Sequence, residues 1–476
     1  MYRITVIGLG VDVNDYPKVL ESYIKSSEKV VVRTALAESY KNLNAFGKEI
    51  TALDFVYEKS RNFDTLNKNL ANEVIKMAKI SPVCYLVDGS AIEDNSVKYI
   101  LDKVKDVEVI SGVSATSKCL ERLKISLSKY TAVSAYEVED NYSLTAPLVV
   151  NAIDSAIVAS KVKLFLSKIF GEELDVFVSS NDFTKKIKLY ELDRLKVYNY
   201  SLSLYIPEVE LKYKEKFDFN DLIKILEILR SPNGCPWDRE QTEKSILKNV
   251  VEEAYELVDA VNLEDDFMIV EETGDLILQS AFYIAFGEEG ARYTRCDVLS
   301  DLCKKLITRH THVFGDDVAN KSSEALSVWN NNKIIEKGYG TATEYLNAVP
   351  KSMPSLMRAE KVGKRANKYG FDFDGFKSAL ESLLLEVEEL KKAVLEKNAE
   401  EVEKECGDLI FSAVNVSRHL GVSAELSLKN TIEKFIKRFS LVEEELKNQN
   451  KDFNGVSQSE LDDIYNLVKA ESENGN

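Results

Sequence analysis

The sequence predicts a multidomain protein: an N-terminal α/β domain followed by two all-α helical modules. Up to about residue 207, β-branched runs alternate with helical patterns, and from about 217 to 473 the pattern is helical almost throughout. The length of 476 residues also exceeds one ordinary domain. We therefore expect domains at 1–207, 217–345 and 355–473.

Short apolar runs predict the strands of the N-terminal domain. They are ITVIGLG (4–10), KVVVRT (29–34), PVCYLV (82–87), VEVI (107–110), PLVV (147–150) and DVFVSS (175–180). Segments with helical spacing lie between them, at 65–79, 93–104 and 154–169. Alternation of this kind indicates a largely parallel sheet.

Breaks in the helical half separate its modules. The segment AVPKSMP (348–354) carries two prolines and predicts a linker between two helical blocks. Asp238 and Gln241 have the spacing of a capping box, so we expect a helix to begin near Arg239.

Charge and composition exclude several classes of function. The formal net charge of −17 argues against binding nucleic-acid polymers, which need a basic surface. Three histidines and six cysteines without CxxC spacing disfavour zinc and iron–sulfur sites and indicate reduced thiols. The sequence shows neither a signal-peptide pattern nor a run of 18 apolar residues. We expect a soluble, cytoplasmic protein without a membrane partner.

The two helical blocks repeat one acidic pattern. EEAYELVDAV (252–261) and VEETGDLIL (270–278) in the first block correspond to EVEELKKAV (386–394) and EKECGDLIF (403–411) in the second. Each block contains four such acids, and each acid of the first block is separated from its counterpart in the second by 133 residues (386 − 253 for the first pair). They are Glu253, Glu256, Glu272 and Asp275, matched by Glu386, Glu389, Glu405 and Asp408. An isolated ExxE pair is usually a solvated helix face, but the duplication at constant spacing disfavours that interpretation.

These carboxylates predict a metal site in each repeat. Residues three apart share one helical face, and carboxylates converging among apolar residues repel unless a cation neutralises them. All-oxygen ligation suits Mg²⁺, with Mn²⁺ as the second choice, and not zinc. Di-iron helical bundles use ExxH where this chain has ExxD, so iron is the weaker interpretation.

Basic residues after each acidic pattern predict a polyphosphate substrate. Lys305 with Arg309 and Lys434 with Arg438 are i, i+4 pairs, and Lys333 and Lys469 follow at matching positions after Trp329 and Tyr465. Lys and Arg neutralise the part of the negative phosphate charge that a divalent cation does not neutralise. Glu252, beside the predicted ligand Glu253, is placed to orient a water or to act as a base. The alternative for the basic pairs is an ordinary charged helix face.

Several segments together resemble the MazG family over about 220–473. They are SPNGCPWDREQT (231–242), EEAYELVDAV, EETGDLILQ, RHTHVFGD (309–316) and VWNNNK (328–333), with ECGDLIFSAVNVSRHLG (405–421) and EKFIKRF (433–439) similar to its C-terminal repeat. The resemblance implies hydrolysis of nucleoside triphosphates to monophosphate and pyrophosphate with Mg²⁺, and helical modules that dimerise. It implies that the eight acids above are the metal ligands. The second repeat departs at Leu385 and Tyr465 and lacks the GCPWD loop.

The N-terminal region resembles the tetrapyrrole methylase fold. ITVIGLG (4–10), VDGSA (87–91) and VEVISGVSAT (107–116) carry the resemblance. It implies an S-adenosylmethionine site at Gly8, Gly10, Asp88, Gly89 and Ser90. Val11, Asp12 and Ser111 depart from the family's loops where the backbone would approach that cofactor.

The leading hypothesis is therefore a Mg²⁺-dependent nucleoside triphosphate pyrophosphohydrolase that cleans the nucleotide pool, acting as a homo-oligomer, most simply a dimer. One alternative places the chemistry in the N-terminal domain, as an S-adenosylmethionine-dependent methyltransferase on a tetrapyrrole-like substrate. Another is a non-enzymatic protein that senses nucleotides or organises an assembly. Pyrophosphate release, S-adenosylmethionine binding and nucleotide binding without turnover distinguish the three.

Overall fold

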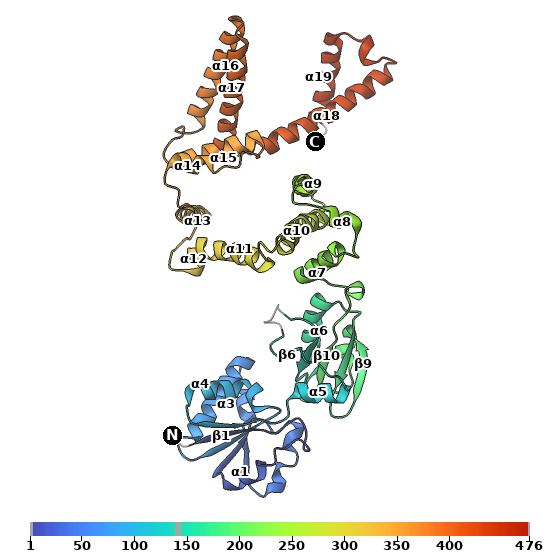
Figure 1. Cartoon of the computed structure of the whole chain (residues 1–476), viewed down its shortest axis with the longest axis vertical. Helices are drawn as coiled ribbons and strands as arrows, with labels where there is room; N and C mark the ends of the chain where they lie inside the picture. The colour runs from blue at the N-terminus through green and yellow to red at the C-terminus, as the bar shows by residue number, and fades with distance from the viewer. Residues whose placement is uncertain (1–2, 139–143, 475–476) are drawn as a thin grey trace. The chain divides into compact units, whose positions relative to one another are not determined.

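The computed structural model describes residues 3–138 and 144–474, and side chains up to residue 470. The chain divides into two compact units, Met1–Arg295 and Cys296–Asn476. The first contains the α/β region and four helices, and the second is helical (Figure 1). The division falls within the predicted module at 217–345; the predicted domain limits remain a prediction.

The first lobe of the α/β region is a parallel sheet in the order β3-β2-β4-β1-β5. Its strands are β1 (Ile4–Gly8), β2 (Lys29–Val32), β3 (Ile50–Ala52), β4 (Val83–Val87) and β5 (Val107–Ile110). All five residues of β1 and of β4 are buried, as expected when helices cover both faces of a parallel sheet. The helices of this lobe are α1 (Leu20–Ser26), α2 (Asp54–Glu58), α3 (Phe63–Met77) and α4 (Asn95–Lys103).

The second lobe is a mixed sheet in the order β6-β7-β10-β8-β9. Its elements are β6 (Thr131–Ser134), β7 (Leu148–Asn151), β8 (Asp175–Ser179), β9 (Thr184–Lys188), β10 (Ser203–Ile206), α5 (Ala115–Leu123) and α6 (Ala156–Phe170). Only β6 and β7 pair in parallel. The prediction of a largely parallel sheet is therefore right for the first lobe and wrong for the second. The short connection between β8 and β9 allows only a hairpin, which is antiparallel.

Four helices complete the first unit: α7 (Phe219–Arg230), α8 (Pro236–Glu240), α9 (Leu247–Asn262) and α10 (Asp266–Glu289). The helix expected to begin near Arg239 instead begins at Pro236, whose missing N–H costs nothing in the first turn, and it ends at Glu240. Ile223, Leu226 and Phe282 belong to the apolar core of this part.

The second unit contains α11 (Arg295–Arg309), α12 (Thr311–Phe314), α13 (Ser322–Lys337), α14 (Ala342–Asn347), α15 (Ser355–Asn367), α16 (Phe376–Leu395), α17 (Ala399–His419), α18 (Ala424–Asn448) and α19 (Gln458–Asn474). Val442, Leu446, Ile464 and Val468 form a small core between α18 and α19. None of the described helices combines the length and apolarity needed to span a membrane.

The sequence repeat corresponds to a repeated helical hairpin, α9–α10 and α16–α17. In each hairpin the turn contains a left-handed residue, Glu264 with φ 54° or Lys397 with φ 53°. The next residue caps the second helix: Asp265 accepts hydrogen bonds from the backbone N–H groups of Phe267 and Met268, and Asn398 accepts one from Glu401. The turns keep the 133-residue offset of the acids (397 − 264), so each hairpin presents its acids in the same register.

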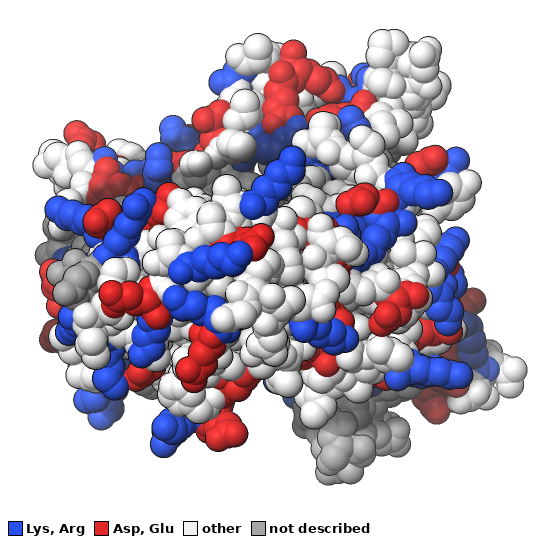
Figure 2. Space-filling model, turned by 90° about the horizontal axis from the view of Figure 1, so that it is seen from below, with Lys and Arg blue, Asp and Glu red and all other residues white. Residues whose placement is uncertain are grey.

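Charges of both signs are interspersed over the face shown in Figure 2. Lys and Arg alternate with Asp and Glu there, between uncharged patches. This face therefore differs from the one-sided basic surface by which proteins bind nucleic-acid polymers.

Candidate metal centres

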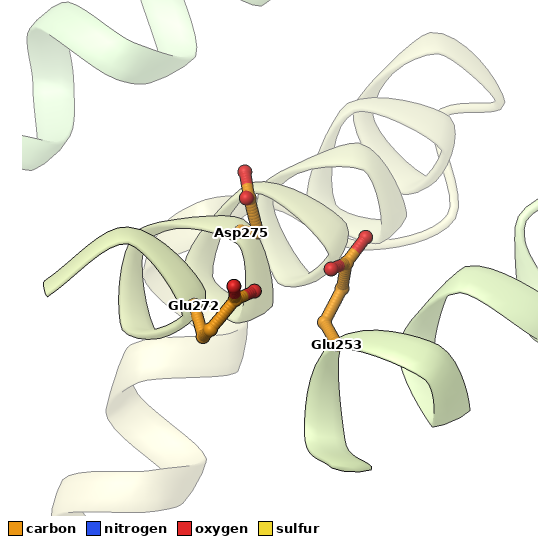
Figure 3. Close-up of side chains that lie close together, drawn as sticks. All are labelled: Glu253, Glu272 and Asp275. Atoms are coloured by element: carbon orange, nitrogen blue, oxygen red, sulfur yellow. The ribbon is translucent and has the colours of Figure 1, made fainter. Parts of the chain in front are cut away.

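The first hairpin brings three of the predicted ligands together. One carboxylate oxygen from each of Glu253, Glu272 and Asp275 lies within 4.8 Å of the others. Glu253 comes from α9, and the other two come from adjacent turns of α10 (Figure 3). Glu272 is buried, at 8% exposure, and Glu253 and Asp275 are half-buried. We call these three residues the first acidic cluster.

Electrostatics shows that the first acidic cluster lacks a compensating charge from its own side chains. Burial raises the pKa of Glu253, and the charges of Asp275, Glu256 and Glu272 raise it further. The pKa of Glu272 is also raised, mainly by burial and next by the negative charge of Glu256. Glu256 thus lies close to the cluster although it is exposed and outside its three-residue core. A divalent cation would remove this repulsion.

Gln279, one turn beyond Asp275 on α10, supports the cluster. Its amide nitrogen donates to Glu253 over 3.4 Å, while its buried oxygen has no hydrogen-bond partner in the described part of the chain. The donors gathered here are all oxygens, the chemistry that Mg²⁺ and Mn²⁺ prefer. The residues present therefore fit a hard divalent cation.

The second hairpin repeats this arrangement with Glu386 from α16 and Glu405 and Asp408 from α17, again within 4.8 Å. We call these three residues the second acidic cluster. Burial raises the pKa of Glu386, as do the charges of Glu389, Asp408 and Glu405. Glu405 is buried at 4% exposure, and its Oε2 has no hydrogen-bond partner among the described residues.

Lys404 distinguishes the second acidic cluster from the first. Its ammonium lies 3.0 Å from Glu405 and 3.0 Å from Glu401, and its charge partly offsets the shift in the pKa of Glu386. The equivalent residue of the first repeat is Glu271, another acid (404 − 133). The second cluster is thus less negative by two charges at this position.

The predicted phosphate-binding residues of the first repeat lie in the second unit, on α11 and α13. Lys305 is half-buried and pairs with Asp301. Arg309 is buried, donates to both carboxylate oxygens of Glu336 at 2.8 and 3.0 Å, and lies over the ring of Trp329. Lys333 is half-buried on α13. Glu252, the predicted base, is exposed on α9 next to Glu253.

The corresponding basic residues of the second repeat lie on the last two helices. Lys434 and Lys469 are exposed on α18 and α19, whereas Arg438 is buried at 9% exposure. The cation that the structure places beside the second acidic cluster is Lys404, which the sequence pattern did not single out.

The glycines expected to bind S-adenosylmethionine contact the protein's own backbone. A Cβ on Gly8 would come within 2.6 Å of backbone atoms of Gly89, Ala91 and Gly112. A Cβ on Gly10 would meet the Asp15 side chain at 2.2 Å. Asp88 accepts a hydrogen bond from Ser39, and Ser90 is buried. Glycine at positions 8 and 10 therefore allows the close packing of the strand ends. Binding of S-adenosylmethionine at these residues stays a prediction, and we derive no step through this cofactor.

Comparison with known proteins bears on the helical region first. The model of the MazG nucleotide pyrophosphohydrolase domain matches twice, at residues 241–314 and 374–442. A nucleoside triphosphate pyrophosphohydrolase of Escherichia coli (strain K12) is 37% identical over 253 residues, which cover 52% of this chain and 95% of that protein. The chain belongs to the MazG family. Each of the two matches contains all three acids of one acidic cluster.

Another relative matches almost the full length of the chain. The uncharacterized protein YabN of Bacillus subtilis (strain 168) is 30% identical over 481 residues, 98% of both chains. The N-terminal α/β region is similar to the precorrin-6Y methylase of Archaeoglobus fulgidus, with a TM-score of 0.33 and 12% identity over 44% of this chain and 99% of that one. The predicted MazG resemblance is confirmed.

Proposed function

We propose that this protein hydrolyses nucleoside triphosphates to nucleoside monophosphate and pyrophosphate with Mg²⁺, Mn²⁺ being the second choice. The duplicated acidic clusters support this proposal most directly. Two hairpins of equal register each gather three carboxylates, and the side chains that the structure describes around them do not fully neutralise their charge. The names of the MazG relatives describe the same activity.

In this proposal the carboxylates of each repeat hold the cation, with Glu256 and Glu389 completing the four acids. The bound cation supplies a Lewis acid for the phosphate chain. Glu252 accepts a proton from the attacking water, whose oxygen bonds to the α-phosphorus. The bond from that phosphorus to the β-bridging oxygen breaks, and pyrophosphate leaves. Lys305, Arg309 and Lys333 bind phosphate oxygens, as do Lys434, Arg438 and Lys469 for the second repeat.

The biological role that we propose is removal of unwanted nucleotides from the cytoplasmic pool by a homodimer. Hydrolysis to the monophosphate withdraws a nucleotide from use by polymerases, which consume triphosphates. Nucleic-acid polymers and membranes are not partners in this proposal.

Substitution of one ligand in each cluster tests the activity. Glu253→Gln and Glu386→Gln each remove one negative ligand with little change in shape. We expect the double variant to lose at least about a hundredfold in Mg²⁺-dependent pyrophosphate release, because even the partners of metal ligands are worth ten- to a hundredfold. Pyrophosphate and orthophosphate are measured separately over a panel of triphosphates.

Glu388→Gln is the matched control. Glu388 is exposed on α16, two residues from Glu386, and pairs with Lys391. This variant should keep wild-type turnover. Release of orthophosphate alone by the wild-type protein, or undiminished turnover by the double variant, would contradict the proposal.

A further inference from the structure

A stripe of four cations runs along one face of α15. Arg358, Lys361, Arg365 and Lys368 follow one another at intervals of three and four residues, so they share a face of the helix and its C-terminal cap. A helix normally uses this spacing for the apolar residues that face a core. The stripe spans about 15 Å, from the helical rise per residue.

The corresponding helix of the first repeat, α7, carries apolar residues at the positions of the stripe. In the sequence, GCPWD (234–238) aligns with GFDFD (370–374) at an offset of 136 (370 − 234). With this offset, Leu222, Ile225 and Leu229 of α7 correspond to Arg358, Lys361 and Arg365 of α15. Leu222 and Leu229 pack on the core of their unit. The second repeat thus carries cations where the first uses apolar contacts, so the cations of α15 do not serve that packing.

The protein itself does not neutralise these cations. In the part of the chain that the structure describes, no carboxylate lies within ion-pair distance of any of the four, and the Nε of Arg358 is buried without a hydrogen-bond partner. The remaining base of α15, Lys364, lies outside the stripe and forms an ion pair with Glu360.

Arg365 is held in place although it has no acidic partner. It is buried at 8% exposure, its guanidinium donates to the backbone oxygen of Tyr345, and it lies 4.4 Å from the centroid of the Tyr345 ring. The ammonium of Lys368 lies 5.6 Å from the same ring. Tyr345 of α14 therefore fixes two cations of the stripe side by side.

Lys333 of α13 extends this positive region. Burial lowers the pKa of Lys333, and the positive charges of Arg309, Arg365, Lys361 and Lys368 lower it further. Arg309 already has Glu336 as a partner, whereas Lys333 has no ion pair among the described residues. Two helices of the second unit, α13 and α15, thus contribute cations without an acidic partner among the described residues to one positive region, in a chain whose net charge is −17.

We propose that Lys333 and the stripe Arg358, Lys361, Arg365 and Lys368 form a binding site for a chain of phosphates, either the triphosphate of a nucleotide or free inorganic polyphosphate. Several cations in a row match the several charges of such a chain better than a single phosphate ion, and arginine forks bind its oxygens in pairs. Lys333 also binds phosphate oxygens in the proposed hydrolysis, but the four cations of the stripe take no part in it. Binding at the stripe does not require the acidic clusters to be catalytic.

Calorimetric titration of the full chain with inorganic tripolyphosphate tests the site. Excess chelator removes divalent cations and with them any binding through the acidic clusters. We expect saturable binding that weakens as salt increases. The double variant Lys361→Gln with Lys368→Gln, both at exposed positions, should bind about tenfold more weakly or worse, since each hydrogen bond to a charged group contributes at least that much.

Lys364→Gln is the matched control, because it removes an exposed cation of the same helix outside the stripe. It should change the affinity less than about twofold. Glu253→Gln with Glu386→Gln should also retain tripolyphosphate binding, which separates this site from the proposed hydrolysis. Equal losses in Lys364→Gln and in the stripe variant would overturn the proposal, as would absence of binding in chelator.

Further ligands distinguish the source of the phosphate chain. Equal affinities for ATP and tripolyphosphate, with much weaker binding of AMP, support recognition of the chain alone. Affinity for ATP more than about tenfold above that for tripolyphosphate supports a nucleotide as the ligand. Tighter binding of a single-stranded RNA oligonucleotide than of either would overturn the assignment to a small phosphate chain.

Discussion

Lys404 and Glu271 occupy equivalent positions, each one residue before a buried ligand of its cluster. The ammonium of Lys404 lies 3.0 Å from Glu405 and competes for the charge that a cation would bind. Glu271 instead raises the pKa of Glu272 by its negative charge. The two repeats should therefore differ in how strongly they attract divalent cations.

We expect Mn²⁺ to bind the first acidic cluster about tenfold more tightly than the second, because one unit charge at several ångströms is worth about 1 kcal/mol even in water. Electron paramagnetic resonance measures the concentration of free Mn²⁺ during a titration. Glu272→Gln should abolish the tighter phase, and Lys404→Glu should bring the weaker phase close to the tighter one. Two identical phases in the wild-type protein would contradict this expectation.

Sequence spacing predicts the carboxylates but not their neighbours. Glu253, Glu272 and Asp275 repeat at constant spacing, and helical periodicity alone places them on facing sides of a hairpin. The contact of Lys404 with Glu405 depends on side-chain rotamers of adjacent residues, which periodicity does not specify. An alignment of the two repeats could have found it, since an acid is replaced there by a base.

At the scale of elements, a glycine interrupts the second helix of each hairpin directly before an acid of the cluster. Gly274 precedes Asp275 and Gly407 precedes Asp408, and a Cβ on either glycine would meet nothing within 4 Å among the described residues. Glycine in a helix interior is less stable than alanine by about 1 kcal/mol. Each hairpin thus forgoes stability to keep open space beside its acids.

Gly274→Ala should stabilise α10 by about 1 kcal/mol and lower pyrophosphate release, because the methyl group enters the space that a substrate would use. Hydrogen exchange of α10 amides measures the first effect and turnover the second. Ser280→Ala, at an exposed position of the same helix, is the control for helix propensity without change beside Asp275. A faster enzyme would show that the space is not used.

Asp372 connects the loop before α16 to the end of α17. Its carboxylate accepts hydrogen bonds from Arg418, one of them at 2.8 Å, and lies 3.1 Å from His419. Arg418 above all lowers the pKa of Asp372 to about 2. Because the folded pKa lies below the unfolded one, this pair stabilises the hairpin above about pH 4 and the effect is lost as the pH falls toward 2.

Asp372→Asn should therefore lower the free energy of opening of α16 and α17 by about 2 kcal/mol at pH 7. Hydrogen exchange of these two helices at pH 7 and, by short labelling, near pH 3 measures the difference from wild type. The difference should shrink at the lower pH. A difference independent of pH would mean that the ion pair does not provide the stabilisation.

The fold could be predicted where periodicity is strong. Short apolar runs rich in β-branched residues predict β1, β2, β4, β5, β7 and β8. β9, with the sequence TKKIK, was missed because three of its five residues are exposed and charged or polar on a sheet edge. The predicted helix start near Arg239 is wrong because Pro236 is well suited to the first position of a helix.

At the scale of the whole molecule, the helical region exposes many large apolar side chains. Leu385 is 64% exposed, Ile410 54% and Ile436 54%. Extended apolar surface on helices commonly marks an interface between subunits. This is consistent with the homodimer that we propose.

Sedimentation velocity should show a dimer that Ile436→Lys weakens at least about tenfold, since a buried charge in an apolar interface is costly. Ile80→Lys is the control, because Ile80 is 75% exposed in the N-terminal α/β region. A wild-type monomer at micromolar concentration, or equal effects of both substitutions, would exclude this interface.

The repeated turn also has a consequence for how the protein could have changed over time. Since each hairpin carries its own cap, its own left-handed residue and its own set of acids, damage to one leaves the other intact. One copy is then free to drift in affinity while the other keeps the ancestral chemistry. The lysine beside Glu405 and the cations of α15 are both found in the second copy, where such divergence would be tolerated.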